Sequence, residues 1–357
     1  MKIIHCADLH LDSPLSANMN REQAGVRNAE ILQSFVRLTQ YAREQRIDAV
    51  LIAGDLFDGE RVTSATVGDV LDAIRQTPEV DYLYLAGNHD NAAGAFSCRA
   101  LPENLFRFSD QWRSFDYEDA LISGIEITQD NCECLYHSVP HADGKCSVVV
   151  LHGQVGTSCG VGQVNLKLLS DCGIDYLALG HLHSYAKQRL GPSGFYCYSG
   201  CLEGRGFDEC GEKGFVLAEL ERGRVQTRFV PFASRRLHRV AVDVTGLRTN
   251  REVLRAMALA AADLSERDMV EYLLTGADDP TSDIALPSLQ RSLRSRHFFT
   301  KLKDERRLAI DPADYQHDVS LKGELIRLVL ASELPDEEKT AIIRAGLAAL
   351  AGEEIAL

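Results

Sequence analysis

The most constraining feature of the sequence is a series of five short apolar runs, each of which ends in Asp, Asn or His. Lys2–Ala7, Ala49–Ala53 and Tyr82–Ala86 are the first three runs, and apolar residues at helical spacing lie between them over Arg21–Arg46 and Ser64–Arg75. Strands that alternate with helices favour crossover units and a largely parallel sheet, so we expect an α/β fold. The polar ends of the five runs are Asp8-Leu9-His10, Gly54-Asp55, Gly87-Asn88-His89-Asp90, His152-Gly153 and Gly180-His181-Leu182-His183.

These polar ends have the composition of a metal site. Sites in open α/β sheets form at the carboxyl ends of strands, where imidazole, carboxylate and amide groups would meet. That donor set suits a pair of divalent ions, and one carboxylate can bridge both. Two ions about 3.5–4 Å apart clamp a phosphate and activate a water for in-line attack. His89 has the spacing of a non-ligand general acid beside them. The expected ligands are Asp8, His10, Asp55, Asn88, His152, His181 and His183.

Each motif alone is weak, because a lone buried His is more often a satisfied core residue than a ligand. The five elements together resemble the signature of the calcineurin-like metallophosphoesterases over about residues 1–230. The resemblance implies a four-layer αββα sandwich, with His89 protonating or stabilising the leaving oxygen. It implies one ion held by Asp8, His10, Asp55 and His183, and a second held by Asp55, Asn88, His152 and His181.

Within this superfamily, the chain is similar to the SbcD-type DNA repair exonucleases, and especially to the short YhaO-like branch. The similarity lies in His5–Pro14, in Tyr198-Ser199-Gly200 followed by Gly206–Gly211, and in the ending Leu347–Glu354. It implies Mn²⁺-dependent cleavage of DNA phosphodiester bonds and a capping domain after the sandwich. It also implies an SMC-like coiled-coil ATPase of the SbcC type as partner. Relatives dimerise, so a homodimer is considered, although no interface is legible in the sequence.

Asp58 departs from part of the family pattern. Archaeal and eukaryotic relatives carry a histidine linked to exonuclease activity at this position, whereas bacterial relatives carry aspartate. We expect Asp58 and Asp90 to support the metal ligands rather than to bind the ions. Gly54–Glu60 also lacks the Arg-Gly that follows this aspartate in the Ser/Thr protein phosphatases, which disfavours that function.

The sequence favours three regions, with a nuclease domain at 1–233, a small α+β capping domain at 234–310 and a helical segment at 311–357. The capping domain is predicted from a β-α-β pattern over Val240–Val244, Glu252–Leu264 and Met269–Leu274. The terminal helices carry apolar positions that fit either a self-packed hairpin or a surface for the coiled-coil partner.

One basic window, Arg291–Arg307, interrupts the acidic composition. Basic residues interleaved with aromatic ones are typical of a surface that binds nucleic-acid phosphates and stacks bases. The same pattern is also typical of a solvated helix whose phenylalanines are buried. The candidate DNA contacts are Arg291, Arg294, Arg296, Lys301 and Lys303.

The formal net charge of −14 argues against a protein that coats nucleic acid or an anionic membrane by bulk charge. The N-terminus has no apolar stretch of signal-peptide length, and no apolar window is long enough to span a bilayer, so we expect a cytoplasmic protein. The ten cysteines are then expected to be reduced or to bind metal. A cluster of cysteines and histidines matches the ligand types of a zinc site, but its spacing fits no standard finger, and reduced cysteines in strands are the alternative. The cluster consists of Cys132, Cys134, His137, His141 and Cys146.

Three functional hypotheses follow. The favoured one is a two-metal DNA exonuclease or endonuclease subunit that acts in DNA repair with the ATPase partner. The second is a phosphodiesterase or phosphatase for a small nucleotide or another phosphoester. The third is a scaffold for assembly whose metal site matters little, which the complete ligand set disfavours.

Overall fold

The computed structural model describes residues 1–15, 19–59, 62–90, 96, 99–278, 282–308, 315 and 317–350. It divides into two compact units, Met1–Arg236 and Leu237–Leu357. The three-part domain division stays a prediction, because its second boundary, at 310, lies outside the described residues. The predicted ending Leu347–Glu354 also lies partly outside them. Among the described helices, none combines the length and the apolar character that a membrane span requires.

The first sheet of unit 1 carries the first three apolar runs. Its parallel strands β1 (Lys2–Cys6), β2 (Ala49–Ala53), β3 (Asp81–Leu85) and β4 (Leu105–Arg107) lie side by side. Two antiparallel strands, β13 (Gly214–Glu221) and β14 (Arg224–Pro231), extend it beyond β1, in the order β14-β13-β1-β2-β3-β4. Every residue of β2 is buried, as a continuous apolar run in a parallel sheet predicts.

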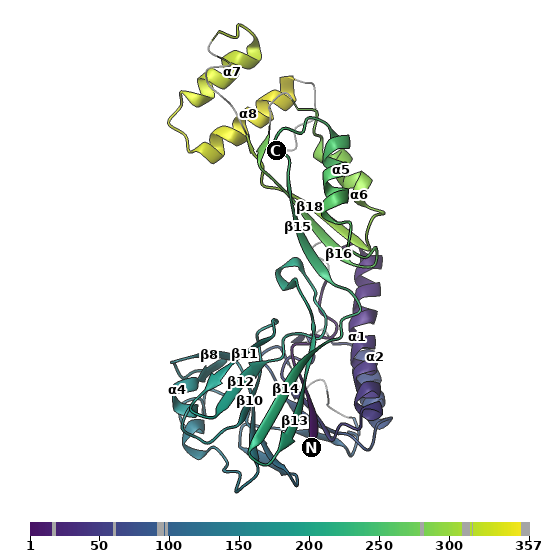
Figure 1. Cartoon of the computed structure of the whole chain (residues 1–357), viewed down its shortest axis with the longest axis vertical. Helices are drawn as coiled ribbons and strands as arrows, with labels where there is room; N and C mark the ends of the chain where they lie inside the picture. Colours follow the sequence, from purple (N-terminus) through teal and green to yellow (C-terminus); the bar gives the residue numbers. More distant parts are fainter. Residues whose placement is uncertain are drawn as a thin grey trace. The chain divides into compact units, whose positions relative to one another are not determined.

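Two helices cover the outer face of this sheet, and Figure 1 shows them side by side. α1 (Arg21–Glu44) starts with a capping box between Asn20 and Gln23, and the side chain of Thr63 caps α2 (Ser64–Arg75). Both helices therefore begin where backbone N–H groups find a side-chain acceptor. Their buried residues, such as Phe35 of α1, pack against the apolar outer face of the first sheet in one continuous core cluster.

The second sheet of unit 1 packs face to face with the first. Its order is β11 (Ala186–Leu190), β12 (Gly194–Tyr198), β10 (Tyr176–Gly180), β7 (Cys146–His152), β6 (Ala120–Gly124) and β5 (Arg113–Asp116). Side chains of both sheets, among them Leu51, Leu83 and Val148, form the core between them.

The αββα sandwich expected from the resemblance is confirmed, although its fourth layer is thin. The outer face of the second sheet is covered by the 3₁₀ helix η2 (Leu135–Ser138), the four-residue helix α4 (Leu166–Leu169) and connecting segments. The small parallel pair β8 (Gln154–Gly156) and β9 (Gln163–Asn165) lies in the chain between β7 and α4.

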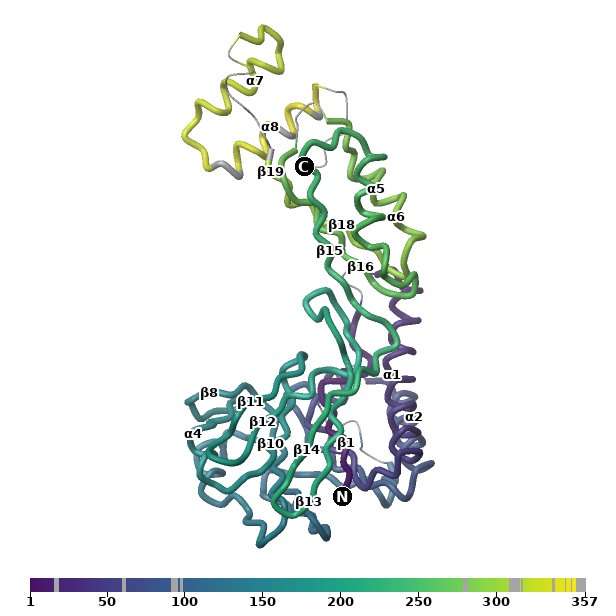
Figure 2. The backbone as a smooth tube through the Cα atoms, in the orientation of Figure 1, coloured from purple at the N-terminus to yellow at the C-terminus, as the bar shows by residue number. Residues whose placement is uncertain are grey.

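Unit 2 begins with the predicted β-α-β pattern. β15 (Leu237–Asp243), α5 (Asn250–Ala260) and β16 (Met269–Thr275) are followed by β17 (Ala277–Asp278) and α6 (Leu286–Leu293). β18 (Phe299–Asp304) completes a parallel sheet in the order β15-β16-β18, and β19 (Arg307–Leu308) pairs with β17. Figure 2 shows α5 and α6 along the same side of the three strands, and the two helices bury Val253 and Leu289 in the core of this unit.

The chain ends in two helices, α7 (Leu321–Leu330) and α8 (Asp336–Leu350), which pack on each other around Ile326 and Ile343. The predicted terminal helices are therefore present and form a hairpin.

One buried ionic network fixes the segment that follows β12. The guanidinium of Arg27 on α1 is fully buried and donates from Nη2 to Glu203 Oε2 at 2.6 Å and to the carbonyl of Gly204 at 2.8 Å. Glu203 also accepts hydrogen bonds from the Ser34 hydroxyl and from the backbone N–H of Ser234. Because two buried charges require each other, this network anchors the segment after Glu203 to α1.

Glu203→Ala should therefore destabilise unit 1 by about 3–5 kcal/mol, since it leaves a buried guanidinium without its main counter-charge. Urea unfolding followed by circular dichroism measures this difference. Glu219→Ala, at an exposed position on β13, is the control and should change the stability by less than about 0.5 kcal/mol. Equal effects of the two substitutions would show that the network does not hold the fold.

Candidate metal centre

The predicted ligands follow the carboxyl ends of β1, β2, β3, β7 and β10, which belong to both sheets of unit 1. Asp8, His10 and Asp55 have positive φ angles of 55°, 45° and 52°, and His181 has 105°. Such angles are uncommon for residues other than glycine, and they cluster at functional sites. The backbone here is therefore shaped to aim side chains inward rather than to continue the strands.

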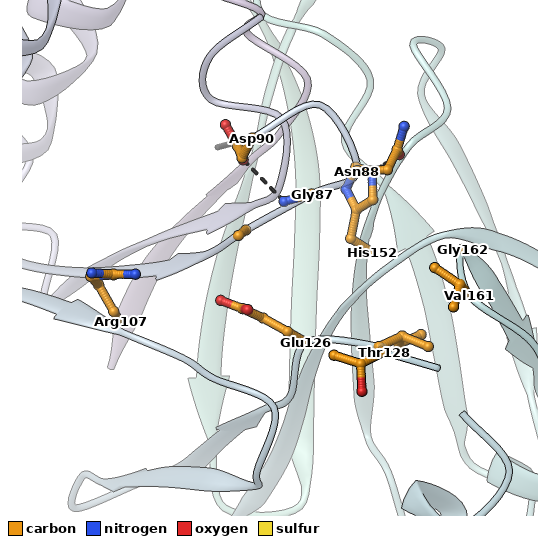
Figure 3. Close-up of a pocket in the computed structure, with 11 residues that line it drawn as sticks. Gly87, Asn88, Asp90, Arg107, Glu126, Thr128, His152, Val161 and Gly162 are labelled. Atoms are coloured by element: carbon orange, nitrogen blue, oxygen red, sulfur yellow. Dashed lines mark hydrogen bonds between the residues drawn. The ribbon is translucent and has the colours of Figure 1, made fainter. Parts of the chain in front are cut away.

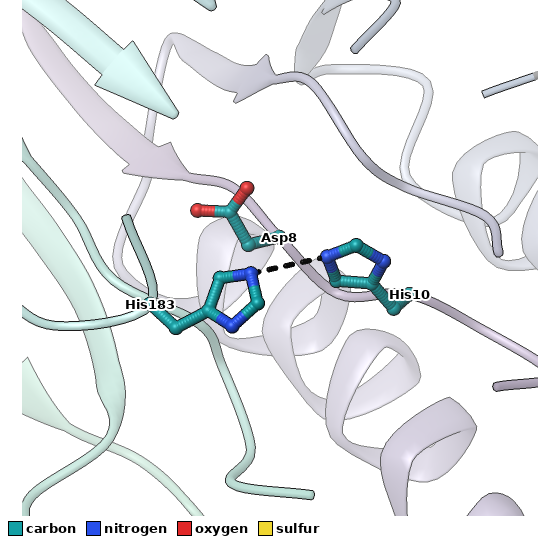
Figure 4. Close-up of side chains that lie close together, drawn as sticks. All are labelled: Asp8, His10 and His183. Carbon is teal, nitrogen blue, oxygen red and sulfur yellow. Dashed lines mark hydrogen bonds between the residues drawn. The ribbon is translucent and has the colours of Figure 1, made fainter. Parts of the chain in front are cut away.

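The first group of donors is Asp8, His10 and His183, shown in Figure 4. Asp8 and His10 are buried, and the Nε2 atoms of His10 and His183 lie 3.3 Å apart. His183 Nδ1 lies 2.7 Å from Glu209 Oε1, so it donates there and leaves its Nε2 as an acceptor. The buried Nδ1 of His10 makes no hydrogen bond of good geometry among the described residues, but Asp58 Oδ1 lies 3.4 Å from it.

The second group of donors is Asn88, His152 and His181. Asn88 Oδ1 lies 3.0 Å from His152 Nε2 and 3.3 Å from His181 Nδ1. Asp55 lies between the two groups, because its Oδ2 is 3.4 Å from His152 Nε2 and 3.6 Å from His10 Nε2. The structure thus brings all seven predicted ligands together, with Asp55 in the place expected of a bridging carboxylate. Their coordination of metal stays a prediction.

Protonation supports a cation site at the second group. His152 Nδ1 donates to the carbonyl of Ala53 at 2.9 Å, and its Nε2 faces two acceptors, Asn88 Oδ1 and Asp55 Oδ2. Burial disfavours the imidazolium, but the hydrogen bond and the charge of Asp55 outweigh it and raise the pKa of His152 to about 9. A divalent cation would replace the Nε2 proton and use the same acceptors.

The first group fits a cation for a complementary reason. Burial raises the pKa of Asp8 to about 6, with further effects from neighbouring charges, and burial lowers the pKa of His10 to about 4. A metal ion would favour the charged carboxylate and the neutral imidazole, which are the forms that bind it.

Two glycines allow the strand ends to approach each other. A Cβ atom on Gly87 would clash with the carboxylate and the backbone nitrogen of Asp55. A Cβ atom on Gly180 would clash with the carbonyl oxygen of Ala53, across the interface between the sheets. The glycines that precede Asn88 and His181 are therefore required by packing against the site.

His89 lies at the edge of the centre, with 51% of its side chain accessible. Its backbone N–H donates to Asp55 Oδ1 at 2.9 Å. Asp58 Oδ1 lies 3.4 Å from His89 Nδ1 and 3.4 Å from His10 Nδ1, so one carboxylate contacts both rings. His10, Asp58 and His89 also form a group of potential metal donors, so the supporting role of Asp58 stays a prediction.

The carboxylate of Asp90 is occupied by backbone hydrogen bonds, and Figure 3 shows the one from Gly87. It accepts from the backbone N–H groups of Leu56, Phe57 and Gly87, at 3.2, 2.8 and 3.0 Å. It therefore ties the loop that carries Asp55 to the loop that carries Asn88 and His89, as a supporting residue would.

Sequence reasoning missed Glu209 and Arg205, which hold His183. Glu209 is buried and accepts from His183 Nδ1, from Arg205 Nη2 at 2.9 Å and from the Arg205 backbone N–H at 2.8 Å. Burial raises the pKa of this carboxyl, but His183 and Arg205 outweigh burial and bring the pKa well below its usual value. The only signal was the family resemblance of Gly206–Gly211, which assigned no role to Glu209.

The basic window is not one surface helix. Arg291 lies on α6 and Lys301 and Lys303 lie on β18, where Lys301 pairs with Glu271 and Lys303 with Glu305. Arg296 donates to the carbonyl of Ala258, and Arg294 caps α6.

The aromatic residues of the window are largely internal. Phe299 is 9% exposed, and His297 is buried against Ser265 and Tyr272. The single helix of the alternative is wrong, because the window turns from helix into strand, whereas its buried phenylalanine is confirmed for Phe299. Phosphate contact by its five candidate cations stays a prediction.

The candidate zinc cysteines do not converge. The thiols of Cys132, Cys134 and Cys146 contact three different carbonyls, those of Gln129, Asn131 and Glu221. None of the potential metal groups among the described residues contains a cysteine.

Glu209→Ala should weaken Mn²⁺ binding to the first group by about 10–100-fold, because the carboxylate fixes the tautomer and the orientation of His183. Isothermal titration of the metal-free protein with MnCl₂ measures this loss. Glu209→Gln, which can still accept from Nδ1, should recover part of it. Glu212→Ala, at an exposed position on the same segment, is the control. Unchanged affinity in Glu209→Ala would contradict this role.

Comparison with known proteins agrees with this geometry. The profile of the family Calcineurin-like phosphoesterase matches residues 1–185, which is more than half of the chain. The uncharacterized metallophosphoesterase YhaO of Bacillus subtilis is 29% identical over 264 residues, which cover 69% of this chain and 64% of the relative. The DNA double-strand break repair protein Mre11 of Methanopyrus kandleri is 27% identical over 289 residues, which cover 71% and 62%. The chain thus matches less than two thirds of the length of either relative.

A solved dimetal phosphatase from Danio rerio is similar at a greater distance, with 12% identity, a TM-score of 0.42 and coverage of 66% of this chain and 99% of the phosphatase. The family assignment rests on the profile match and on the arrangement of the strand ends. The chain belongs to the calcineurin-like phosphoesterase family.

Proposed function

We propose that this chain is the nuclease subunit of a DNA repair complex, which hydrolyses phosphodiester bonds with two Mn²⁺ ions. One observation carries the proposal: Asp55 Oδ2 lies 3.6 Å from His10 Nε2 of one donor group and 3.4 Å from His152 Nε2 of the other, and His89 stands exposed beside them. Oxygen and imidazole donors without cysteine suit a pair of divalent ions. The choice of Mn²⁺ follows from the resemblance to the SbcD-type nucleases.

We assign three roles to the residues of the centre: metal ligands, a group that stabilises or protonates the leaving oxygen, and a carboxylate that orients this group. When bound, the two ions would neutralise the phosphate and supply an ionised water as nucleophile. Asp8, His10, Asp55 and His183 would hold one ion, and Asp55, Asn88, His152 and His181 the other. His89 would stabilise or protonate the leaving oxygen, and Asp58, which contacts its Nδ1 side, would orient the ring.

DNA is favoured as the substrate by a similarity and by the size of the chain. A relative at 27% identity is described as a DNA double-strand break repair protein. Unit 2 adds more than 100 residues and a set of exposed cations, which a small phosphoester would not require. A phosphodiesterase or phosphatase for a small nucleotide remains the second candidate, because the same donors would serve it.

The terminal hairpin supports an SMC-like coiled-coil ATPase as partner. Leu321 and Leu328 of α7 are 71% and 64% exposed, and Ile342 of α8 is 40% exposed. A hairpin that packs on itself through Ile326 and Ile343 and still presents leucines to solvent has an apolar face available for another helix. Such a face fits the amphipathic base of a coiled coil.

His89→Ala should lower Mn²⁺-dependent cleavage of linear DNA by about 10²–10⁴-fold, since a positioned acid contributes this much. Mn²⁺ binding should persist, because His89 is outside both ligand groups, whereas Asp55→Ala should lose both binding and cleavage. His141→Ala, at another exposed histidine of unit 1, is the control. Full activity of His89→Ala and Asp55→Ala would refute the mechanism. Hydrolysis of bis(p-nitrophenyl) phosphate but not of DNA, with or without the partner, would favour the second candidate.

Neutralising Arg291, Arg294, Lys301 and Lys303 to Gln should weaken DNA binding and flatten its salt dependence, because each lost phosphate contact removes about 0.9 from the slope of log K against log salt. Fluorescence anisotropy with a labelled duplex at several salt concentrations measures the slope. Arg251→Gln with Arg255→Gln, on exposed positions of α5, is the matched control. An unchanged slope would assign the window to a structural role.

A further inference from the structure

One segment of unit 1, residues 201–213, holds His183 by its imidazole ring and by its main chain. We call this segment, which joins β12 to β13, the strap. At the ring, Glu209 accepts from His183 Nδ1 at 2.7 Å. At the main chain, the carbonyl of His183 accepts from Lys213 Nζ at 2.5 Å and from the backbone N–H of Cys201 at 3.4 Å. The strap therefore fixes both the ring and the backbone of a predicted ligand of the first group.

Lys213 is a buried cation at the end of the strap. It is 4% exposed, and taking an ammonium group out of water costs free energy unless the group is hydrogen-bonded. Its Nζ donates to the carbonyl of His183, a main-chain acceptor rather than a carboxylate. A charged donor makes a stronger hydrogen bond than a neutral one, so the main chain of His183 is held firmly at this point.

The main chain of Lys213 holds a second segment. Its carbonyl accepts from the backbone N–H groups of Phe232 and Ala233, at 2.8 and 3.2 Å. These two residues begin the exit segment, residues 232–235, which leads from β14 toward β15, the first strand of unit 2. One residue of the strap is therefore bonded both to a predicted metal ligand and to the exit segment.

The beginning of the strap is anchored to the same two places in the chain. Glu203 is buried against Arg27 of α1 and accepts from the backbone N–H of Ser234 in the exit segment at 2.5 Å. Together with the two bonds to the carbonyl of Lys213, three backbone N–H groups of the exit segment thus donate to the strap. The exit segment cannot move away from the strap without breaking them.

We propose that Lys213 is a positioning residue for the first metal ion and couples this ion to the exit segment. The proposal rests on the proposed two-metal function and adds a means of regulating the same centre. While the exit segment is bonded to its carbonyl, Lys213 keeps its side chain on the main chain of His183, so the ligand is ordered before the ion binds. When the exit segment is loosened, the ion must order the ligand itself, which lowers its affinity.

Thermodynamic linkage makes this effect reciprocal. If an ordered exit segment favours Mn²⁺ binding, bound Mn²⁺ favours the ordered exit segment by the same factor. The exit segment continues directly into unit 2 along the chain. A partner that binds unit 2 and displaces or restrains the exit segment would therefore change the metal affinity of unit 1.

Hydrogen exchange of the full chain, followed by mass spectrometry, tests the coupling without any substitution. Saturating MnCl₂ should slow the exchange of residues 232–234 by about fivefold or more, within the usual range of coupling between two sites. The reference is the loop of residues 76–80, which precedes β3 and so lies at the opposite end of this strand from Asn88. Its exchange should be slowed much less. Equal slowing of both segments would indicate general stabilisation and would overturn the coupling.

Lys213→Met keeps the backbone and about the length of Lys213 but removes its donor. It should weaken Mn²⁺ binding to the first group by about tenfold in isothermal titration, as loss of support for a ligand does. It should also abolish the slowing of exchange by Mn²⁺ in the exit segment. Lys213→Arg, which can still donate to the carbonyl of His183, should recover part of both effects. Lys167→Met, at an exposed position on α4, is the matched control.

A substitution in the exit segment tests the coupling from the other direction. Ala233→Pro removes one of the two N–H groups that the carbonyl of Lys213 accepts. It should weaken Mn²⁺ binding about fivefold through the linkage. Ala233→Ser keeps the N–H group and should bind Mn²⁺ as the wild type does.

The outcomes separate this proposal from the proposed function. Unchanged Mn²⁺ affinity in folded Lys213→Met would overturn the positioning role, and unchanged affinity in folded Ala233→Pro would overturn the coupling. If these variants do not fold, the exchange of the wild type still decides, because it needs no substitution. Mn²⁺ binding without protection of the exit segment would refute the coupling and leave the proposed function intact. No Mn²⁺ binding at all would refute the metal centre and the coupling together.

Discussion

The candidate site depends on the close approach of two sheets at the carboxyl ends of their strands. The contact is made by His152 of β7, which donates from Nδ1 to the carbonyl of Ala53 at the end of β2. Gly180, at the end of β10, has no room for a side chain against the same carbonyl. This packing brings together donors that lie as far apart in the sequence as Asp8 and His183. It also fixes the tautomer of His152 and directs Nε2 toward Asn88 and Asp55.

A large part of the fold and of the site could be predicted from the sequence, because both are determined by local patterns. Fully apolar runs such as Ala49–Ala53 have no alternative to a buried strand, and the polar residues that follow them must gather where parallel strands end. The prediction that Asp55 bridges two groups agrees with its distances to His10 and His152.

The residues that the sequence did not reveal act through distant contacts. Glu209 supports His183 across 26 positions, and Arg205 donates to the same carboxylate. None of these relations leaves a periodic pattern. Neither reading of the basic window foresaw its change from helix to strand, because Leu289 and Leu293 pack into the core from α6 and Phe299 starts β18. Tertiary packing therefore overrode the local pattern there.

Most of the negative net charge lies in the region that contains the candidate metal centre. Residues 1–233 carry a net charge of −11 and residues 234–357 carry −3. Two divalent ions would return four positive charges to the acidic unit, at the place where a phosphate would have to bind. The net charge still argues against bulk attraction of DNA, so capture would depend on the ions and on local cations of unit 2.

The central claim is that one carboxylate, Asp55, joins two metal ions in a single centre. Anomalous diffraction from crystals grown with Mn²⁺ tests it most directly. The account predicts two anomalous peaks about 3.5–4 Å apart, with the Asp55 carboxylate between them and no peaks at this site in Asp55→Ala crystals. A single peak, or two peaks that persist without Asp55, would contradict it.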